Sequence, residues 1–409
     1  MKIKWPPEFP GANWYDKAEE RAVVQVVRNG APFRYYGAKK PRFVLAYEAA
    51  ARRFYGVKHA LAVNSGTGAL MTAMNALGIG PGDEVIVPSF FWVATVGAVV
   101  AHNAIPVLCE IDDSFTMDPA DLARKITPRT RLIVPVHMTG GVCDMKSIMA
   151  IANQRGITVL EDCAQCNGGT FAGRKVGTFG RAGMFSLQIN KNCTTGEGGL
   201  LVTDDEQLYW KLNAAHDVGV PWVGGGPKAD MGVALWGSGR RMSELIGAAA
   251  SVQMRKLPAI LKHMRQSKNR IKAMLQGTPG LGFRRQNDPA GDTASFLTLI
   301  LSDEPSAVAA AQRLRDGGIG ASHLPAYGMH LYYNIPQLVN KVPLSAAGNP
   351  WSLPQNAQSV FSYAKGACPR SDALLARSIV LPIPSVLTRA QEQRAAKIIR
   401  GAVTPAGLG

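Results

Sequence analysis

Val159-Leu160-Glu161-Asp162-Cys163-Ala164-Gln165 begins with the end of an apolar run, which two acidic residues follow. Short apolar runs rich in β-branched residues are typical of a buried strand. In open α/β sheets, ligands bind beyond the carboxyl ends of the strands. We therefore predict that residues 158–161 form a strand of an α/β sheet, and that Asp162 faces a ligand at the end of this strand.

The same pattern continues on both sides of this run. Short apolar runs alternate with helical stretches from residue 60 to residue 203, separated by turn signals such as Gly80-Pro81-Gly82-Asp83. This alternation predicts βαβ units that form a doubly wound, mainly parallel sheet. Besides residues 158–161, the predicted strands are residues 60–64, 84–88, 105–110, 130–136, 182–186 and 199–202.

The second half of the chain predicts a smaller α+β domain. Residues 243–275 carry apolar side chains at helical spacing, and we place the domain boundary inside this helix. Strands at 295–301 and 379–382 and helices at 306–316 and 388–403 follow it. Residues 328–368 show little periodicity, which indicates an ordered functional loop. The predicted division is an N-terminal segment (residues 1–40), a large domain (41–255) and a small domain (256–409).

Composition and charge exclude several classes of protein. The formal net charge of +16 would suit a nucleic-acid-binding protein, but the basic residues are spread along the chain. We therefore expect no nucleic-acid binding, and a positive field that attracts small anions. We find neither a signal-peptide pattern at the start nor an apolar run long enough for a membrane span, so we expect a cytoplasmic protein without membrane contact.

The cysteines indicate free thiols. The chain has six, and only Cys163 and Cys166 form a C-x-x-C pair. That spacing suits a redox dithiol or half of a zinc site, but no second close pair accompanies it. We expect buried small side chains and no metal site.

Ser65-Gly66-Thr67 follows a predicted strand and precedes a helix at residues 69–77. Backbone N–H groups at such a helix start, with the two hydroxyls, can hold a phosphate, although the same residues would also serve as a plain N-cap. Met71 stands where a dinucleotide fingerprint has its third glycine, and no P-loop motif occurs. The pattern therefore disfavours nicotinamide and P-loop enzymes.

Lys191 lies in a turn between two apolar strands, beside the Gly-rich residues 196–199. Desolvation at such a place lowers the pKa of a lysine and makes its amine able to form an imine. Asp162 could keep a pyridinium nitrogen protonated, so that the ring accepts electrons, or it could merely cap the next helix. A phosphate site, an acid and a lysine in this order predict pyridoxal 5'-phosphate (PLP) as the cofactor.

The motifs together resemble the DegT/DnrJ/EryC1/StrS family of PLP-dependent sugar and cyclitol aminotransferases, over most of the chain. They are residues 65–67, 88–92, 135–137, 161–165, 185–191, 196–199 and 241–245. The resemblance implies fold type I, the aspartate-aminotransferase-like fold, with a large mainly parallel-sheet domain and a small C-terminal α+β domain. It also implies a homodimer with composite active sites, because residues 237–241 match a segment that reaches the partner's cofactor phosphate.

The resemblance implies a role for each candidate site residue. Lys191 would be the Schiff-base lysine and Asp162 the partner of the pyridine nitrogen, and these two are the candidate catalytic residues. Gln165 would contact the ring on its hydroxyl side, and Trp92 would stack on the ring. The phosphate would be held by Ser65, Gly66, Thr67 and Ser186.

Three positions depart from the family pattern. Gly239 stands where many relatives have an Asn that reaches a cofactor phosphate, and Arg240 beside it could take over this contact. Asn167 replaces a common His, and Thr139 replaces a common Tyr. We therefore expect the substrate contacts to differ from those of the nucleotide-sugar enzymes.

The function that we predict is transfer of an amino group from glutamine or glutamate to a keto-cyclitol or keto-sugar. Residues 33–37 and Gln188 are more similar to the inosose and aminohydroxybenzoate-synthase branch than to the UDP-sugar branch. Lys191 argues against the sugar-dehydrating branch, which has a His instead. Two alternatives are a nucleotide-linked keto-sugar as acceptor and a non-catalytic PLP-fold regulator or binding protein.

Overall fold

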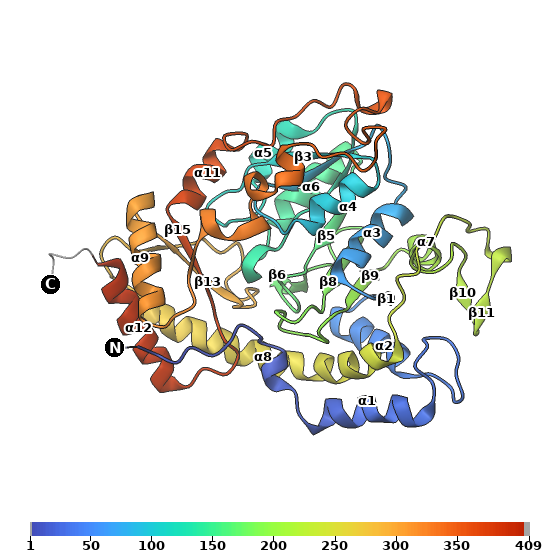
Figure 1. The fold of residues 1–409 in the computed structure, drawn as a ribbon, viewed down its shortest axis with the longest axis horizontal. Helices are drawn as coiled ribbons and strands as arrows, with labels where there is room; N and C mark the ends of the chain where they lie inside the picture. The colour runs from blue at the N-terminus through green and yellow to red at the C-terminus, as the bar shows by residue number, and fades with distance from the viewer. Residues whose placement is uncertain (1, 405–409) are drawn as a thin grey trace.

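The computed structural model describes residues 2–404. Its large domain is built on a seven-stranded sheet in the order β1-β9-β8-β5-β4-β2-β3 (Figure 1). Five neighbouring strands, β8, β5, β4, β2 and β3, run parallel to one another. Strand β9 runs antiparallel to both β8 and β1. The strands are β1 His59–Val63, β2 Glu84–Pro88, β3 Ile105–Cys109, β4 Thr130–Ile133, β5 Thr158–Asp162, β8 Ala182–Ser186 and β9 Gly199–Thr203. The mainly parallel sheet predicted from the apolar runs is confirmed.

Helices cover both faces of this sheet, because successive side chains of a strand point to opposite faces. Leu61 and Val63 of β1 pack in a core with α3 (Gly66–Ala76), α4 (Ala94–Ala101) and α7 (Glu206–His216). Ala60 and Ala62 pack on the other face with α2 (Phe43–Tyr55) and α8 (Glu244–Leu275). Helices α5 (Pro119–Lys125) and α6 (Met145–Arg155) complete this second layer.

Helix α8 (Glu244–Leu275) joins the two domains and runs along one side of the molecule (Figure 1). It begins at the N-cap Ser243, whose side chain accepts a hydrogen bond from the N–H of Ile246. The helix is continuous through residue 255, where we placed the boundary between the domains. That division of the chain remains a prediction.

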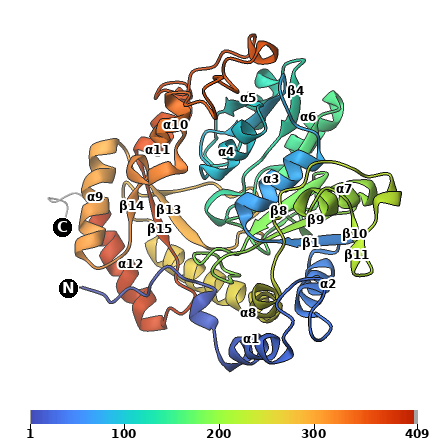
Figure 2. The ribbon, with the colours of Figure 1, turned by 45° about the vertical axis from the view of Figure 1, so that its right-hand side comes forward.

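The small domain contains an antiparallel sheet in the order β12-β13-β15-β14. Its strands are β12 Gly282–Phe283, β13 Phe296–Ile300, β14 Ser322–His323 and β15 Ser378–Pro382, and its long helices are α9 Glu304–Asp316 and α12 Arg389–Val403. The segment that precedes α1 (Lys17–Asn29) lies beside α12 in both views (Figures 1 and 2), and Ile3 belongs to the core of this domain. The predicted α+β architecture is therefore present.

Residues 328–368 pack back onto the large domain. Tyr332 and Tyr363 are buried in the same core as α3 and α4. The segment contains the short helix α10 (Pro336–Val339) and 3₁₀ turns, and α11 (Pro369–Ala376) follows it. It is thus an ordered segment rather than a linker.

The remaining elements are small or lie near the start of the chain. Helix α1 (Lys17–Asn29) begins with a capping box formed by Asp16 and Glu19. Two short hairpins are formed by β6 Thr170–Phe171 with β7 Arg174–Lys175 and by β10 Trp222–Val223 with β11 Gly226–Pro227. Within residues 2–404, every helix is too short or too polar to cross a membrane.

Candidate active site

A cavity of about 410 Å³ lies at the carboxyl ends of β5 and β8. Its lining includes every residue predicted for the site except Arg240, namely Ser65, Gly66, Thr67, Trp92, Asp162, Gln165, Ser186 and Lys191. These residues come from separate loops, which the parallel strands bring to one edge of the sheet. The structure therefore brings the predicted residues together in one place.

Lys191 follows β8 in a tight turn, where its own N–H donates to the carbonyl of Gln188 at 2.9 Å. Its carbonyl accepts a hydrogen bond of 3.0 Å from the N–H of Gly11, so the segment before α1 closes over this turn. Burial lowers the pKa of the Lys191 ammonium below its ordinary value, although Asp162 and Glu8 act in the opposite direction. The neutral amine, which can act as a nucleophile or a base, therefore forms more easily at Lys191 than at an exposed lysine.

Asp162 is almost fully buried at the end of β5. Its Oδ2 accepts from the hydroxyl of Thr95 at 2.9 Å, and its Oδ1 accepts from the N–H of Ala164 at 3.0 Å. Burial raises the pKa of the Asp162 carboxyl, while these two hydrogen bonds and Lys191 counteract the rise. A cationic ring nitrogen at this carboxylate would relieve the cost of keeping the charge buried.

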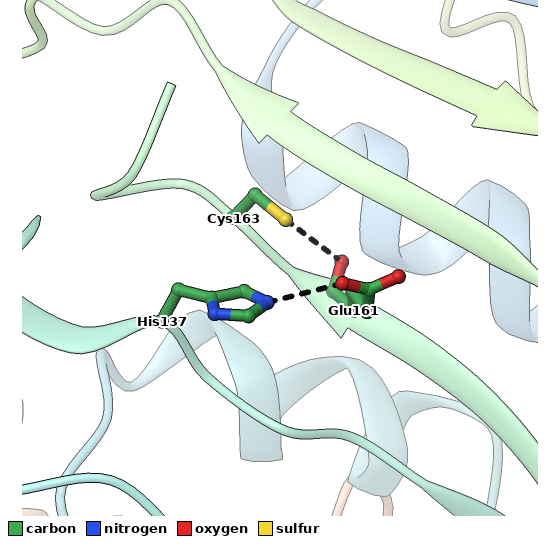
Figure 3. Close-up of side chains that lie close together, drawn as sticks. All are labelled: His137, Glu161 and Cys163. Atoms are coloured by element: carbon green, nitrogen blue, oxygen red, sulfur yellow. Dashed lines mark hydrogen bonds and ion pairs between the residues drawn. The ribbon is translucent and has the colours of Figure 1, made fainter. Parts of the chain in front are cut away.

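His137, Glu161 and Cys163 form a buried cluster next to Asp162 (Figure 3). His137 Nε2 lies 3.2 Å from Glu161 Oε2, and His137 Nδ1 accepts from the N–H of Cys143 at 3.0 Å. Three backbone N–H groups also donate to the Glu161 carboxylate at 2.6–2.8 Å, those of Gly177, Phe179 and Gly180.

Because these hydrogen bonds occupy both carboxylate oxygens of Glu161 and both ring nitrogens of His137, the cluster offers a metal ion no free set of ligands. Its role is structural. The carboxylate of Glu161 ties the loop after β7 to the end of β5, which carries Asp162.

The start of α3 forms a cradle for an anion. The hydroxyl of Ser65 caps the helix by accepting from the N–H of Gly68 at 2.9 Å. The N–H groups of Gly66 and Thr67 have no acceptor within residues 2–404. A Cβ on Gly66 would lie 2.8 Å from Cβ of Ser186, so only glycine lets these two segments meet. Two free N–H groups, two hydroxyls and the helix dipole fit a phosphate.

Trp92 and Gln165 also line the cavity. The indole of Trp92 is 41% exposed, and its ring centroid lies 4.7 Å from that of His330. Gln165 Oε1 accepts from the N–H of Thr139 at 3.0 Å, which leaves the amide nitrogen of Gln165 without a partner within residues 2–404. An aromatic face and an amide donor are thus available to a planar ring with a hydroxyl group.

Two of the departures from the family pattern are now placed. Asn167 is buried away from the cavity, and its Nδ2 donates to the carbonyl of Ser186 at 3.0 Å. Thr139 is also buried, has a φ of 52°, and supports Gln165 through its backbone N–H. Both residues therefore position cavity residues instead of lining the cavity themselves.

Arg240 lies beside the start of α3 but does not line the cavity. A Cβ on Gly68 would lie 3.2 Å from Cδ of Arg240, and the guanidinium is bonded to the hydroxyl of Ser238. Gly239 before it has a φ of 64°, the left-handed region that favours glycine. The role of Arg240 in phosphate binding remains a proposal.

Glu8, Tyr327 and His330 are among the cavity residues that were not found from the sequence. Tyr327 and His330 stack with ring centroids 4.2 Å apart, and His330 Nδ1 lies 2.9 Å from the carbonyl of Tyr327. Burial lowers the pKa of His330 to about 4, so its ring is neutral at pH 7. The sequence signal for His330 was its place in the predicted loop of residues 328–368, and Tyr327 directly precedes that loop.

The donor set fits PLP. The cradle at Ser65, Gly66, Thr67 and Ser186 suits the phosphate, Asp162 suits the pyridine nitrogen, and Lys191 suits the carbonyl carbon.

Comparisons with known proteins agree with this arrangement. The sequence pattern of the DegT/DnrJ/EryC1/StrS aminotransferase family matches residues 15–400. The chain is 35% identical over 301 residues to the L-glutamine:2-deoxy-scyllo-inosose aminotransferase of Streptomyces kanamyceticus, covering 70% of this chain and 68% of that protein. It is 44% identical over 180 residues to GDP-perosamine synthase of Caulobacter vibrioides, covering 44% of this chain and 48% of that protein.

A solved structure shows the same fold along the whole chain. The crystal structure of 3-amino-5-hydroxybenzoic acid synthase superposes with a TM-score of 0.81 at 26% sequence identity, and the match covers 98% of both chains. The prediction of an aminotransferase, rather than a non-catalytic binding protein, is confirmed. The chain belongs to the DegT/DnrJ/EryC1/StrS aminotransferase family and is a PLP-dependent aminotransferase of fold type I.

Proposed function

We propose that this enzyme transfers the amino group of glutamine to a keto-cyclitol, and that it works as a homodimer. The observation that carries the proposal is the charge of the cavity. Its charged lining residues are Glu8, Asp162, Lys191 and Glu197, and the other polar groups there are mainly hydroxyls and amides. A neutral, hydroxyl-rich ring suits such a lining, because hydroxyl groups donate to carboxylates and amides.

Three residues of the cavity have separate roles in the proposed reaction. PLP, when bound, would supply a ring that accepts electrons as a bond to Cα of the amino donor breaks. The amine of Lys191 removes the proton from Cα of the amino donor and returns a proton during amination of the ketone. Asp162 would hold the ring nitrogen, and Trp92 would stack on the ring and fix its plane.

Glutamine is preferred over glutamate as the donor for an electrostatic reason. Glutamate brings a second carboxylate, which is best recognised by an arginine with a bidentate pair of hydrogen bonds. No arginine lines the cavity formed by residues 2–404. The similarity to an L-glutamine:2-deoxy-scyllo-inosose aminotransferase supports the same choice.

A nucleotide-linked keto-sugar is the second candidate acceptor. The 44% identity to GDP-perosamine synthase over 180 residues favours it, although that match covers less than half of either chain. A diphosphate would need cationic partners, and in the cavity of a single chain Lys191 is the only cationic residue within residues 2–404. We therefore rank the keto-cyclitol first.

The homodimer is proposed from the segment at residues 237–241, which matches a stretch that reaches across the subunit interface in the family. Trp236 directly before it is 91% exposed, as is typical of an aromatic side chain at an interface. Sedimentation combined with activity at increasing dilution tests this point. Loss of activity at the dilution at which monomers form supports composite sites, and a fully active monomer rules them out.

Product analysis tests the proposed reaction. The PLP-loaded protein is incubated with glutamine and either 2-deoxy-scyllo-inosose or a GDP-linked keto-sugar, and the amines formed are measured by mass spectrometry. We expect amination of the cyclitol, with glutamine used faster than glutamate. Amination of the nucleotide sugar alone would support the second candidate.

A further inference from the structure

Hydrogen bonds made by residues before and after Glu8 in the sequence fix the position of Glu8 at the cavity. Before it, the N–H of Ile3 donates to the carbonyl of Gly317 at 2.9 Å. After it, the hydroxyl of Ser385 donates to the carbonyl of Pro10 at 2.7 Å, and the N–H of Gly11 donates to the carbonyl of Lys191 at 3.0 Å. The segment is therefore fixed to the small domain and to the turn of the catalytic lysine.

Gly11 shows how closely this segment approaches the active site. A Cβ at position 11 would lie 2.9 Å from the carbonyl oxygen of Lys191 and 2.9 Å from Cγ2 of Thr194. Prolines at positions 6, 7 and 10 further restrict the backbone around Glu8. The position of the Glu8 carboxylate is thus set by the fold rather than by a flexible tail.

The carboxylate of Glu8 has no hydrogen bond or ion pair of its own within residues 2–404, although the residue is half-buried and lines the cavity. Desolvation raises the pKa of the Glu8 carboxyl, and the charge of Lys191 acts against this rise. A half-buried carboxylate without a partner is costly, and a ligand that donates hydrogen bonds would remove this cost.

We propose that Glu8 is a specificity-determining residue whose two carboxylate oxygens accept hydrogen bonds from neighbouring hydroxyl groups of the keto-cyclitol acceptor. This inference rests on the proposed function and identifies the group that recognises the acceptor. A carboxylate matches a vicinal diol with two acceptors, and it disfavours acceptors that bring a carboxylate or phosphate to the same place. The amino donor gains less from Glu8, because its own carboxylate is repelled.

The experiment compares wild-type holoenzyme with Glu8→Gln, which keeps the size of the side chain and removes its charge. Glu20→Gln is the matched control, since Glu20 is exposed on α1 and its side chain pairs, among residues 2–404, only with Lys17. The donor half-reaction with glutamine and the acceptor half-reaction with 2-deoxy-scyllo-inosose are followed separately by absorbance. Calorimetry with scyllo-inositol, a ring polyol without a ketone, measures binding apart from turnover.

For Glu8→Gln we expect KM for the cyclitol and Kd for scyllo-inositol to rise about tenfold or more, the effect of losing hydrogen bonds to a charged group. We expect the acceptor half-reaction to slow about tenfold more than the donor half-reaction, while Glu20→Gln behaves like the wild type. Equal slowing of both half-reactions with unchanged polyol binding would overturn the assignment of Glu8. Failure of the wild type itself to aminate the cyclitol would contradict the proposed function, and this inference with it.

Discussion

The hydroxyl of Thr95 donates a 2.9 Å hydrogen bond to Oδ2 of Asp162, from the first turn of α4 to the end of β5. Together with the N–H of Ala164 on Oδ1, this bond fixes the orientation of the carboxylate. The fixed carboxylate can keep the ring nitrogen of PLP protonated without rearranging during the reaction.

Asp162→Asn tests this role. We expect the variant to bind PLP and to lose about 10²- to 10³-fold in kcat, the magnitude typical of removing one preorganised electrostatic contact. Thr95→Val removes only the supporting hydrogen bond, so we expect a loss of about tenfold. Steady-state kinetics on PLP-saturated protein measure both. A near-normal kcat for Asp162→Asn would mean that Asp162 only caps the turn at Ala164.

The lowered pKa of Lys191 predicts a pH dependence in the apoenzyme. Burial favours the neutral amine, so competitive acetylation of Lys191 should reach half its maximum rate at a pH below the ordinary lysine value of 10.5. Asp162 and Glu8 stabilise the ammonium, so Asp162→Asn and Glu8→Gln should each move this midpoint further down. A midpoint at or above 10.5 would contradict the assigned environment of Lys191.

Arg240→Ala tests the proposed substitute for the missing Asn. If the guanidinium binds the cofactor phosphate of either subunit, its loss removes about 1.5–3 kcal/mol and weakens PLP binding about tenfold or more. Titration of the apoenzyme with PLP measures the change. An unchanged curve would leave the phosphate to the hydroxyls and N–H groups at the start of α3.

Gly141→Ala tests the packing of the Arg284 guanidinium beside Thr139. The guanidinium of Arg284 is buried against Gly141, and its Nη1 donates to the hydroxyl of Thr139 at 2.5 Å. A Cβ at position 141 would lie 1.0 Å from Nη2 of Arg284 and would displace it. We expect a loss of about 1–3 kcal/mol in the free energy of unfolding, measured in urea.

Gly97→Ala is the control for that experiment. Gly97 lies in α4, where a Cβ would meet nothing within 4 Å, so alanine should stabilise the helix by about 0.5–1 kcal/mol. Equal stability of Gly141→Ala and the wild type would show that Arg284 moves aside at no cost.

The sequence predicted the large sheet and most of the candidate site, because both depend on local patterns. Buried parallel strands are continuous apolar runs, so β5 and β8 could be located by inspection. Asp162 directly ends β5, and Ser65 caps α3, so each residue is placed by its own strand and turn. The helix after Ser65 begins at Gly66, three residues earlier than predicted, since the phosphate cradle is itself its first turn.

The parts that could not be predicted depend on contacts between distant segments. Glu8 reaches the cavity through the bond from Gly11 to Lys191, and nothing in residues 1–11 indicates this contact. His330 is placed by the hydrogen bond from the N–H of Phe91 to its carbonyl. Helix α1 was missed although Asp16 and Glu19 form a capping box, a signal that was available in the sequence.

The most direct test of the account is to identify the lysine that holds the cofactor. The PLP-loaded protein is reduced with borohydride and digested, and the pyridoxyl-modified peptide is sequenced by mass spectrometry, with Lys191→Ala as the comparison. We predict that the modification lies on Lys191 and that Lys191→Ala folds but retains neither fixed cofactor nor turnover. Modification of another lysine, or full activity of Lys191→Ala, would contradict the account.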